Sequence, residues 1–170
     1  MVDAFKTFPH LLEPLVIGNV VFRNRMFCAP TGHADIIPDG QPSTDALMVF
    51  ERAAIGGAAM VAEGEVCVDP REFRDGRWPR EITRNTNYNY HRIASIVTRH
   101  GSIASMELTH SGSGPHPIAR KLAKAEGRPL EGPSATTLYE GSEVVAMTED
   151  RIYELIEGTG SFKTAIDINL

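Results

Sequence analysis

Hydrophobic residues in this chain fall into two patterns, short continuous runs typical of strands and spaced positions typical of helices. Leu15–Ile17 and Val20–Phe22 are β-rich triplets separated by Gly18-Asn19, a two-residue loop with turn chemistry, so they predict a hairpin. Arg25–Ala29 predicts a short strand that is halted by Pro30. The first ordered elements are therefore expected to be a hairpin and a single strand.

A loop and then a helix are expected next. The segment 31–42 is rich in Gly, Pro and Asp, which predicts the loop. Ser43 or Thr44 can cap a helix that ends at Gly56-Gly57, because glycines commonly follow helix C-termini. The apolar residues at helical spacing are Leu47, Phe50 and Ala54.

The following strand is predicted to be buried on both faces. Ala58–Ala62 is continuously apolar and is closed by Glu63-Gly64, as expected in a parallel sheet. Parallel strands require crossover helices, and Asn87–His100 has the apolar stripe of one. That stripe is Tyr90, Ile93, Ile96 and Val97. A third strand is then predicted over Ser102–Leu108.

The segment Ser111–Met147 is predicted to be a long loop, because it is heavy in Gly, Pro, Ser and Thr and lacks strong periodicity. Its basic cluster Arg120–Lys124 is interpreted as a solvated loop in preference to a contact for an anionic substrate such as a CoA thioester. Thr148 then opens a helix with Glu149 and Asp150 in its first turn. The expected apolar stripe is Ile152, Leu155, Ile156, Phe162 and Ile166.

Strand and helix units that repeat roughly every 35 to 45 residues indicate either a doubly wound sheet or a (β/α)8 barrel. No Gly-rich dinucleotide-binding fingerprint follows the first strand. The loops after the three strands are also longer than the loops before them. Both observations favour the barrel, an α/β fold in which those longer loops carry the active site.

Composition is that of an ordinary globular domain, with 170 residues, 42% hydrophobic and 23% charged. The formal charge of -5 gives no basic excess for nucleic acid or an anionic membrane surface, so neither is expected as a partner. No apolar run approaches the roughly 20 residues of a spanning helix, and the start lacks a signal peptide, so a cytoplasmic protein is expected. Cys28 and Cys67 are interpreted as reduced, buried thiols.

The predicted strands end in residues suited to a flat ligand, because parallel strands of a barrel deliver their C-terminal residues to one face. Small residues at the first two ends let backbone amides approach a ring, while Glu107 and His110 offer side-chain contacts at the third. Such residues can equally be structural, so the pattern alone leaves both interpretations open. The three ends are Ala29–His33, Glu63–Glu65 and Glu107–His110.

Five motifs follow one another along nearly the whole chain. They are Leu12–Asn19 with Arg23–Pro30, Gly56–Gly64, Glu107–Gly112, Gly132–Ala135 and Met147–Asp150. In this order they resemble the motifs of the old yellow enzyme family of FMN-dependent ene-reductases. The Glu-Leu-Thr-His form of the third motif resembles the larger enoate, dienoyl and steroid reductases of that family.

The resemblance implies a flavin-binding (β/α)8 barrel, of which residues 1–170 form an incomplete N-terminal part with about three βα units after a hairpin. It implies FMN as the cofactor, NADH or NADPH as the reductant and a small-molecule alkene as the substrate. Carried over by position, strand ends one, two and three supply the flavin contacts. These cofactor-binding residues are Ala29, Pro30, Thr31, Gly32, Gly64 and Glu107.

Three positions depart from the family pattern. Gly32 stands where many relatives have a Thr or Cys that tunes the flavin potential, and Ser113 stands where the family has an Arg. Glu107 stands where the family usually has a Gln, whose amide both donates and accepts. An ionised Glu only accepts, so it would repel a ring carbonyl and the anionic reduced flavin unless its pKa is raised or its contact differs.

The resemblance places the family's proton-handling residues at strand four and its FMN phosphate site after strands seven and eight. We therefore expect no catalytic residue in this chain and expect those residues beyond Leu170, since a whole barrel needs roughly 250 residues. An open three-stranded sheet exposes its edges, so a homo-oligomer or a completing chain is the expected partner. An iron–sulfur cluster would belong only to a downstream region, because two cysteines cannot hold one.

Two alternatives remain open at this point. Instead of the N-terminal part of an ene-reductase, the chain would then be a non-catalytic truncated or split subunit that needs a partner chain, or a barrel fragment of a different class such as a phosphate-binding lyase. A metal site is not expected, because the spacing of His33, His100 and His116 matches no compact ligand motif.

Overall fold

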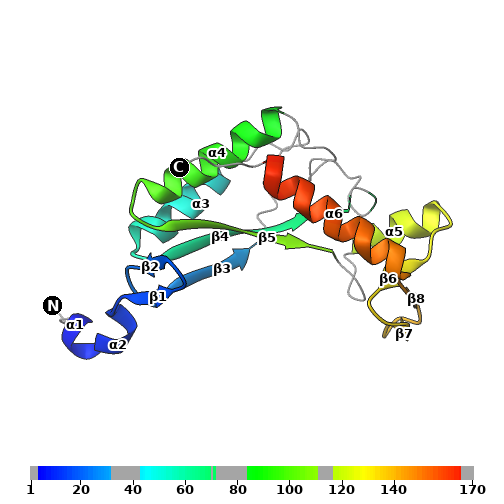
Figure 1. The fold of residues 1–170 in the computed structure, drawn as a ribbon, viewed down its shortest axis with the longest axis horizontal. Helices are drawn as coiled ribbons and strands as arrows, with labels where there is room; N and C mark the ends of the chain where they lie inside the picture. Colours follow the sequence, from blue (N-terminus) through cyan, green and yellow to red (C-terminus); the bar gives the residue numbers. More distant parts are fainter. Residues whose placement is uncertain (1–3, 32–42, 70, 72–83, 111–116, 166–170) are drawn as a thin grey trace. The chain divides into compact units, whose positions relative to one another are not determined.

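The computed structural model describes residues 4–31, 43–69, 71, 84–110 and 117–165, and Figure 1 draws them as a coloured ribbon. The chain divides into two compact units. Unit 1 comprises residues 1–36, 42–65 and 88–107, and unit 2 comprises residues 37–41, 66–87 and 108–170. None of the described helices is long and apolar enough to cross a membrane.

Unit 1 begins with two single-turn helices and the predicted hairpin. The helices are α1 (Ala4–Thr7) and α2 (Pro9–Leu12). Strands β1 (Leu15–Ile17) and β2 (Val20–Phe22) then pair antiparallel, which confirms the hairpin. Gly18 in the connecting turn has a φ of 60°, a left-handed value that glycine adopts without steric cost.

Strand β3 (Phe27–Thr31) runs through Pro30, so the prediction of a strand over residues 25–29 halted there was wrong. Its register with the next strand shifts between Cys28 and Thr31, which is the signature of a bulge. Proline lacks a backbone N–H but is tolerated at a bulge, where the regular ladder of hydrogen bonds is interrupted. The strand can therefore continue past Pro30.

Helix α3 (Thr44–Ile55) has the predicted cap, because the Ser43 hydroxyl accepts from the Ala46 backbone N–H at 3.1 Å. Strand β4 (Met60–Cys67) follows and pairs parallel with β3. It extends past residues 63–64, which were expected to close it. The fully buried Val66 explains the extension, since it continues the apolar pattern beyond the Glu-Gly-Glu sequence.

The βα repeat continues with α4 (Arg84–Thr98) and β5 (Ile103–Thr109), both within about three residues of the predicted bounds. The strand order is β3-β4-β5, and in Figure 1 their arrows run side by side in one direction. The buried apolar residues of unit 1 come from α3, α4 and β4 and from Ala59 directly before β4. They are Ala46, Phe50, Ala54, Ala59, Val61, Ala62, Tyr90, Ile93, Ala94 and Val97.

Unit 2 contains regular structure where the sequence predicted a long loop. Residues 117–146 form helix α5 (Pro117–Ala125) and strands β6 (Leu130–Gly132), β7 (Thr136–Thr137) and β8 (Glu143–Ala146). Strand β8 lies between β6, to which it is parallel, and β7, to which it is antiparallel. Strands of two to four residues are too short for periodicity to show, which explains the wrong prediction.

Helix α6 (Glu149–Ala165) begins as predicted, and the Thr148 hydroxyl accepts from the Arg151 backbone N–H at 3.2 Å. Of the predicted apolar stripe, Ile152 and Ile156 are exposed and Leu155 is half-buried, whereas Arg151 is buried. The first turns of α6 therefore direct a charged side chain into the interior of unit 2. The burial of the stripe residues Phe162 and Ile166 lies outside the described part of the chain.

Candidate functional site

Three predicted site residues from three neighbouring strands meet in unit 1, and Gly64 lies at the centre. A Cβ built on Gly64 would lie 2.8 Å from Pro30 Cβ, 2.9 Å from Glu107 Cβ and 3.0 Å from Glu107 Oε2. Such distances leave no room for any side chain at this position. We call these three residues, Pro30, Gly64 and Glu107, the strand-end platform.

The remaining predicted contacts on β3 lie beside the platform. Ala29, Pro30 and Thr31 are exposed, and Glu107 is exposed on β5, while Gly64 itself is buried. The Thr31 hydroxyl donates to the Ala29 carbonyl at 3.3 Å, which fixes its side chain back onto the strand. The sixth predicted residue, Gly32, lies outside the described residues, as does the departure at position 113.

The strand-end platform fits a flat ring in two respects. It combines exposed small residues on β3 with a glycine over which the Pro30 and Glu107 side chains come together, so the strand ends offer a surface without a projecting side chain at position 64 on which a planar group can lie. The Glu107 carboxylate reaches across Gly64, which places a hydrogen-bond acceptor at the platform. The residues present therefore suit a ring with N–H donors on its edge.

A buried carboxyl group stands next to the platform in sequence. Glu63 precedes Gly64 on β4, and because side chains alternate along a strand it belongs to the opposite face. Burial raises the pKa of Glu63 to about 7, and its Oε2 atom has no hydrogen-bond partner among the described residues. Burial, followed by the charge of Glu63, also raises the pKa of Tyr90. The sequence offered no signal for this pair.

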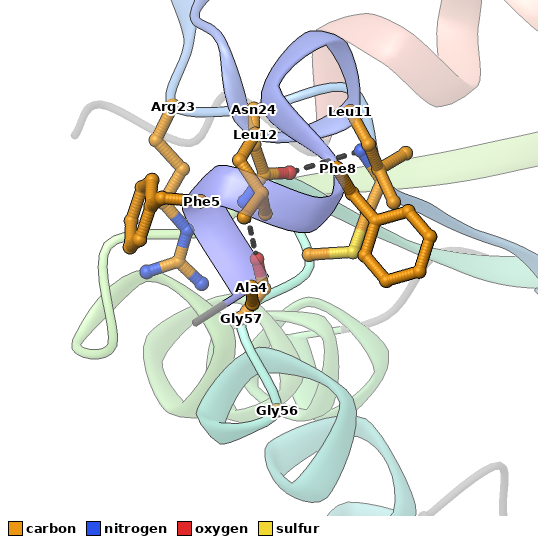
Figure 2. A pocket seen from close by; sticks show the side chains of 10 residues that line it. Ala4, Phe5, Phe8, Leu11, Leu12, Arg23, Asn24, Gly56 and Gly57 are labelled. Atoms are coloured by element: carbon orange, nitrogen blue, oxygen red, sulfur yellow. Dashed lines mark hydrogen bonds between the residues drawn. The ribbon is translucent and has the colours of Figure 1, made fainter. Parts of the chain in front are cut away.

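An apolar cavity of roughly 550 Å³ lies elsewhere in unit 1, and Figure 2 shows its lining. Phe5, Phe8 and Leu11 line it together with Met26, directly before β3, and Gly56-Gly57, before β4. It therefore sits at the start of the strands, whereas parallel barrels bind their ligands at the strand ends. The cavity is not a candidate for the flavin.

Polar contacts close the same strand-start end. The Asn24 side chain donates to the Gly57 carbonyl at 2.7 Å and accepts from the Met26 N–H at 2.9 Å, as the dashed lines in Figure 2 show. The Arg23 guanidinium donates to four oxygens at 2.7–2.9 Å. These acceptors are the carbonyls of Ala54, Ala58 and His100 and the hydroxyl of Ser102. Arg23 and Asn24, which precede β3, therefore fix the conformation of the chain at this end of the strands.

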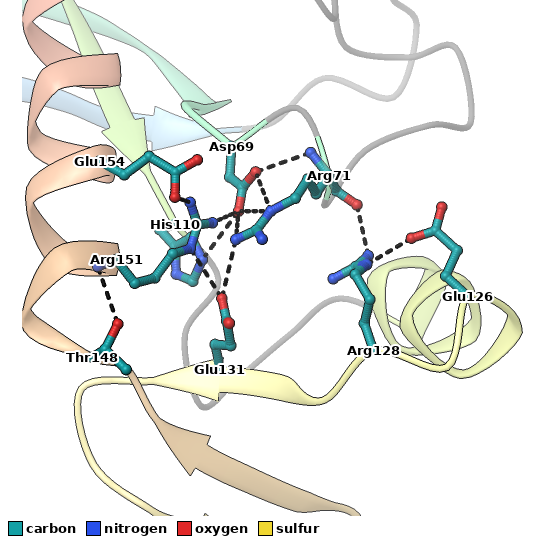
Figure 3. Close-up of polar contacts among 9 residues, drawn as sticks. All are labelled: Asp69, Arg71, His110, Glu126, Arg128, Glu131, Thr148, Arg151 and Glu154. Carbon is teal, nitrogen blue, oxygen red and sulfur yellow. Dashed lines mark hydrogen bonds and ion pairs between the residues drawn. The ribbon is translucent and has the colours of Figure 1, made fainter.

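A network of charged side chains holds unit 2 together, as Figure 3 shows. Asp69, just after β4, accepts from the guanidinium groups of Arg71 and Arg151, and its side chain is only 4% exposed. Glu131 on β6 accepts from the same two groups, from Arg71 Nη2 at 3.1 Å and from Arg151 Nε at 3.1 Å. Two carboxylates and two guanidiniums thus balance each other in a largely buried site.

His110 belongs to this network. Its Nε2 lies 3.7 Å from Asp69 Oδ2, and its side chain is 14% exposed. The sequence offered His110 as a ligand contact or a structural group, and the structure places it beside a buried carboxylate. The arginines 71 and 151 carried no sequence signal, since their partners lie 60 and 20 residues away at Glu131.

Metal and thiol chemistry find no support in the described part of the chain. No group of three or more His, Cys, Asp or Glu side chains there is placed to hold a metal ion. Cys28 is a free thiol, but it is half-buried and not fully buried as predicted. The Nε2 atom of His100 lies 2.9 Å from Glu51 Oε1. His33 and His116 lie outside the described residues.

Comparison with known proteins decides the family. The family described as NADH:flavin oxidoreductase / NADH oxidase matches residues 10–166. The chain belongs to this family. The match spans all five motifs that the sequence placed in order, and it excludes the alternative of a phosphate-binding lyase.

Solved structures of the old yellow enzyme type share the fold of this family member. Old yellow enzyme from a Pichia species is 25% identical, with a TM-score of 0.73 over 93% of this chain and 43% of its own. Morphinone reductase in complex with tetrahydroNAD is 20% identical, with a TM-score of 0.68 over 92% of this chain and 47% of its own. A 2-naphthoyl-CoA reductase in complex with 2-naphthoyl-CoA is 19% identical, with a TM-score of 0.70 over 92% of this chain and 26% of its own.

The predicted fold is therefore confirmed as an α/β fold corresponding to part of a (β/α)8 barrel. The chain spans about a quarter to a half of the length of these solved relatives. The family description names flavin and NADH, in agreement with the cofactor and reductant predicted from the motifs.

Proposed function

We propose that this chain supplies the flavin-ring contacts of an FMN-dependent oxidoreductase that reduces an activated C=C bond with hydride from NADH or NADPH. The observation that carries the proposal is the meeting of Pro30, Gly64 and Glu107 at the ends of three adjacent strands. Family membership supports it, because the family is defined by flavin and NADH chemistry. Bound flavin supplies the hydride-accepting and hydride-donating centre, which no amino acid side chain provides.

The strand-end platform holds the ring mainly through shape. Gly64 has no side chain, so Pro30 and Glu107 come together over it and nothing projects between them to lift a planar group off the strands. Ala29 and Thr31 extend the same edge with small side chains, and the Thr31 hydroxyl is turned back onto Ala29. We include Gly32 in the ring site by its position in the motif alone.

Glu107 supplies the electrostatic part of the site. Its carboxylate accepts a hydrogen bond from a ring N–H, which orients the ring on the platform. An ionised carboxylate also disfavours negative charge on the reduced ring, so it lowers the reduction potential relative to the Gln that the family usually carries. Glu107 therefore tunes the ease of reduction, and we assign it no role in proton transfer.

We further propose that other strands complete the sheet around this site, from the same polypeptide or from another copy or partner chain. Among the described strands, β3 and β5 each pair with β4 and leave their outer edges open. Phe27 on β3 is 42% exposed, which is unfavourable for a large apolar residue of a barrel strand. The proton donor of the reaction is assigned to that completing part, and none of the described residues is assigned a catalytic role.

Replacing Glu107 by Gln tests the flavin-edge role. In the flavin-loaded protein, E107Q is expected to raise the flavin midpoint potential by on the order of 20 mV, the two-electron equivalent of about 1 kcal/mol. Spectroelectrochemical titration measures the potential, and oxidation of NADH that depends on an α,β-unsaturated ketone reports the activity. The exposed Glu157 on α6 gives the matched control, E157Q, which should leave the potential unchanged. An unchanged potential in E107Q would show that Glu107 points away from the ring.

A further inference from the structure

A second cleft, in unit 2, is built from residues that the proposed function does not use. It has a volume of roughly 450 Å³ and lies along α5 and the chain that connects it through β6 to β8. Four of its lining residues are cationic, and Ser142 adds a hydroxyl. The cations are Arg120, Lys121, Lys124 and Arg128. These are four of the 17 Lys and Arg residues in a chain with a net charge of -5, so the cleft reverses the overall sign of the protein.

Carboxylates neutralise only part of this charge. Arg120 pairs with Glu140, and Arg128 Nε lies 2.6 Å from Glu126 Oε2 while its Nη2 donates to the Arg71 carbonyl at 2.9 Å. Lys121 and Lys124 are exposed, and neither forms an ion pair within the described residues. Glu143 also lines the cleft, but it is engaged by the Thr137 hydroxyl at 3.1 Å. Four cations and three carboxylates thus leave the cleft with a net positive charge, carried by lysines that form no ion pair in the described part of the chain.

The cations on α5 are spaced so that they lie next to one another on the helix surface and repel each other. Arg120 and Lys124 are four residues apart and Lys121 and Lys124 three apart, so they are neighbours on the surface of α5. Like charges at these spacings destabilise a helix by about 0.2–0.5 kcal/mol a pair. The first turn of α5 carries no acidic residue to offset them. A bound anion would relieve this repulsion and stabilise α5.

We propose that this cleft binds a ligand carrying two or more phosphate groups. Ammonium groups bind phosphate oxygens as point charges, and an arginine contributes planar, bidentate donors once its surface carboxylate is exchanged for a phosphate. Two unpaired lysines next to two such arginines match a diphosphate better than a single carboxylate. Pro129 and Leu130 add an apolar wall, which leaves room for an organic group attached to the phosphates. The inference goes beyond the proposed function and does not depend on the flavin platform.

Calorimetric titration of the chain with inorganic pyrophosphate and with ADP tests the proposal, with adenosine as the uncharged comparison. Pyrophosphate and ADP should bind and adenosine should not, and binding should weaken steeply as salt is raised. ADP binding more tightly than pyrophosphate supports a nucleotide as the source of the phosphates, and equal binding supports the diphosphate alone. Failure of both anions to bind at low salt would overturn the proposal.

A double variant, Lys121→Gln with Lys124→Gln, should lose at least about tenfold in pyrophosphate affinity, since each removes a charged contact worth roughly 1 kcal/mol. The matched control removes two cations from unit 1, Lys6→Gln with Arg52→Gln, and should bind like the wild type. Equal affinity of the two double variants would contradict the assignment.

Amine labelling of the wild type gives a second readout that needs no variant. Pyrophosphate should slow acetylation of Lys121 and Lys124, measured by mass spectrometry, and leave the rate at Lys6 unchanged. Equal labelling rates with and without pyrophosphate would refute the site. The flavin proposal is tested with riboflavin, which has no phosphate, so either proposal can fail without the other.

Discussion

At the scale of the residue, Glu63 and Gly64 are consecutive on β4 and belong to opposite faces of the sheet. Gly64 meets the ends of the adjacent strands, where a Cβ has no space, and Glu63 is buried on the other side. A buried carboxyl with an unpartnered oxygen is stable only in its neutral form, which is why its pKa rises to about 7. Stability should therefore depend on pH through this one group.

The direction of the pH effect follows from proton binding. Between the ordinary pKa of 4.5 and the folded value of about 7, the folded state of Glu63 binds the proton that the unfolded state releases. The free energy of unfolding should therefore fall as pH rises through this window, by a total of about 3 kcal/mol. Urea unfolding at about pH 5 and about pH 8 measures the difference.

Glu63→Gln should remove this dependence and raise the free energy of unfolding at about pH 8, because a neutral amide replaces a forced charge. The exposed Glu157→Gln is the control and should keep the wild-type dependence on pH. If Glu63→Gln and the wild type lose stability in parallel above neutral pH, the buried carboxyl is not the group responsible.

At the scale of the element, the network of Asp69, Arg71, Glu131 and Arg151 joins the end of β4, strand β6 and helix α6. The Arg151 side chain is 9% exposed and that of Asp69 4%, so removal of either leaves a buried charge with one opposite charge fewer. We expect Arg151→Met and Asp69→Asn each to lower the free energy of unfolding by about 3 kcal/mol. The double variant should lose less than the sum, because the second change removes the charge that the first left underneutralised. Additive losses would show that the two side chains do not interact; Glu154→Gln, whose side chain is exposed, is the control.

Prediction from sequence succeeded where local rules govern an element. The hairpin followed from Gly18-Asn19 between two β-rich triplets, and the start of α3 followed from the capping hydroxyl of Ser43. Prediction failed where contacts between residues far apart in the chain determine the local structure. Pro30 continues a strand only because a bulge with β4 accommodates it, and Ile152 and Ile156 of α6 are exposed while Arg151 takes the interior position.

The candidate site was predictable in its members but not in its geometry. Motif order singled out Pro30, Gly64 and Glu107, although nothing in their spacing shows that they meet at one point. That contact depends on the register of three strands, which involves backbone pairs far apart in the sequence. The charged network escaped prediction for the same reason, since its partners lie far apart in the sequence. The basic cluster of the cleft was noticed but was interpreted as a solvated loop, because the short elements around it lack periodicity.

At the scale of the whole molecule, exposed apolar side chains and open strand edges dominate the expected behaviour. Phe5, Phe8, Val16 and Val21 are each more than half exposed, and β3 and β5 pair only with β4 among the described strands. Such surfaces favour association. We expect the purified chain to self-associate with rising concentration, measured by light scattering. Gly158→Ala, where a Cβ finds ordinary contact at 3.7 Å, should not change this, and a monomer at all concentrations would contradict the need for completing strands.

Riboflavin binding shows whether the strand-end platform holds a flavin ring. Quenching of riboflavin fluorescence by the chain should saturate, because the platform contacts the ring and not the phosphate. Gly64→Val should weaken this binding at least tenfold, since its side chain has no room and would displace Pro30 and Glu107, while Gly158→Ala should bind like the wild type. Equal quenching by Gly64→Val and the wild type, or no quenching by either, would show that the platform does not hold the ring.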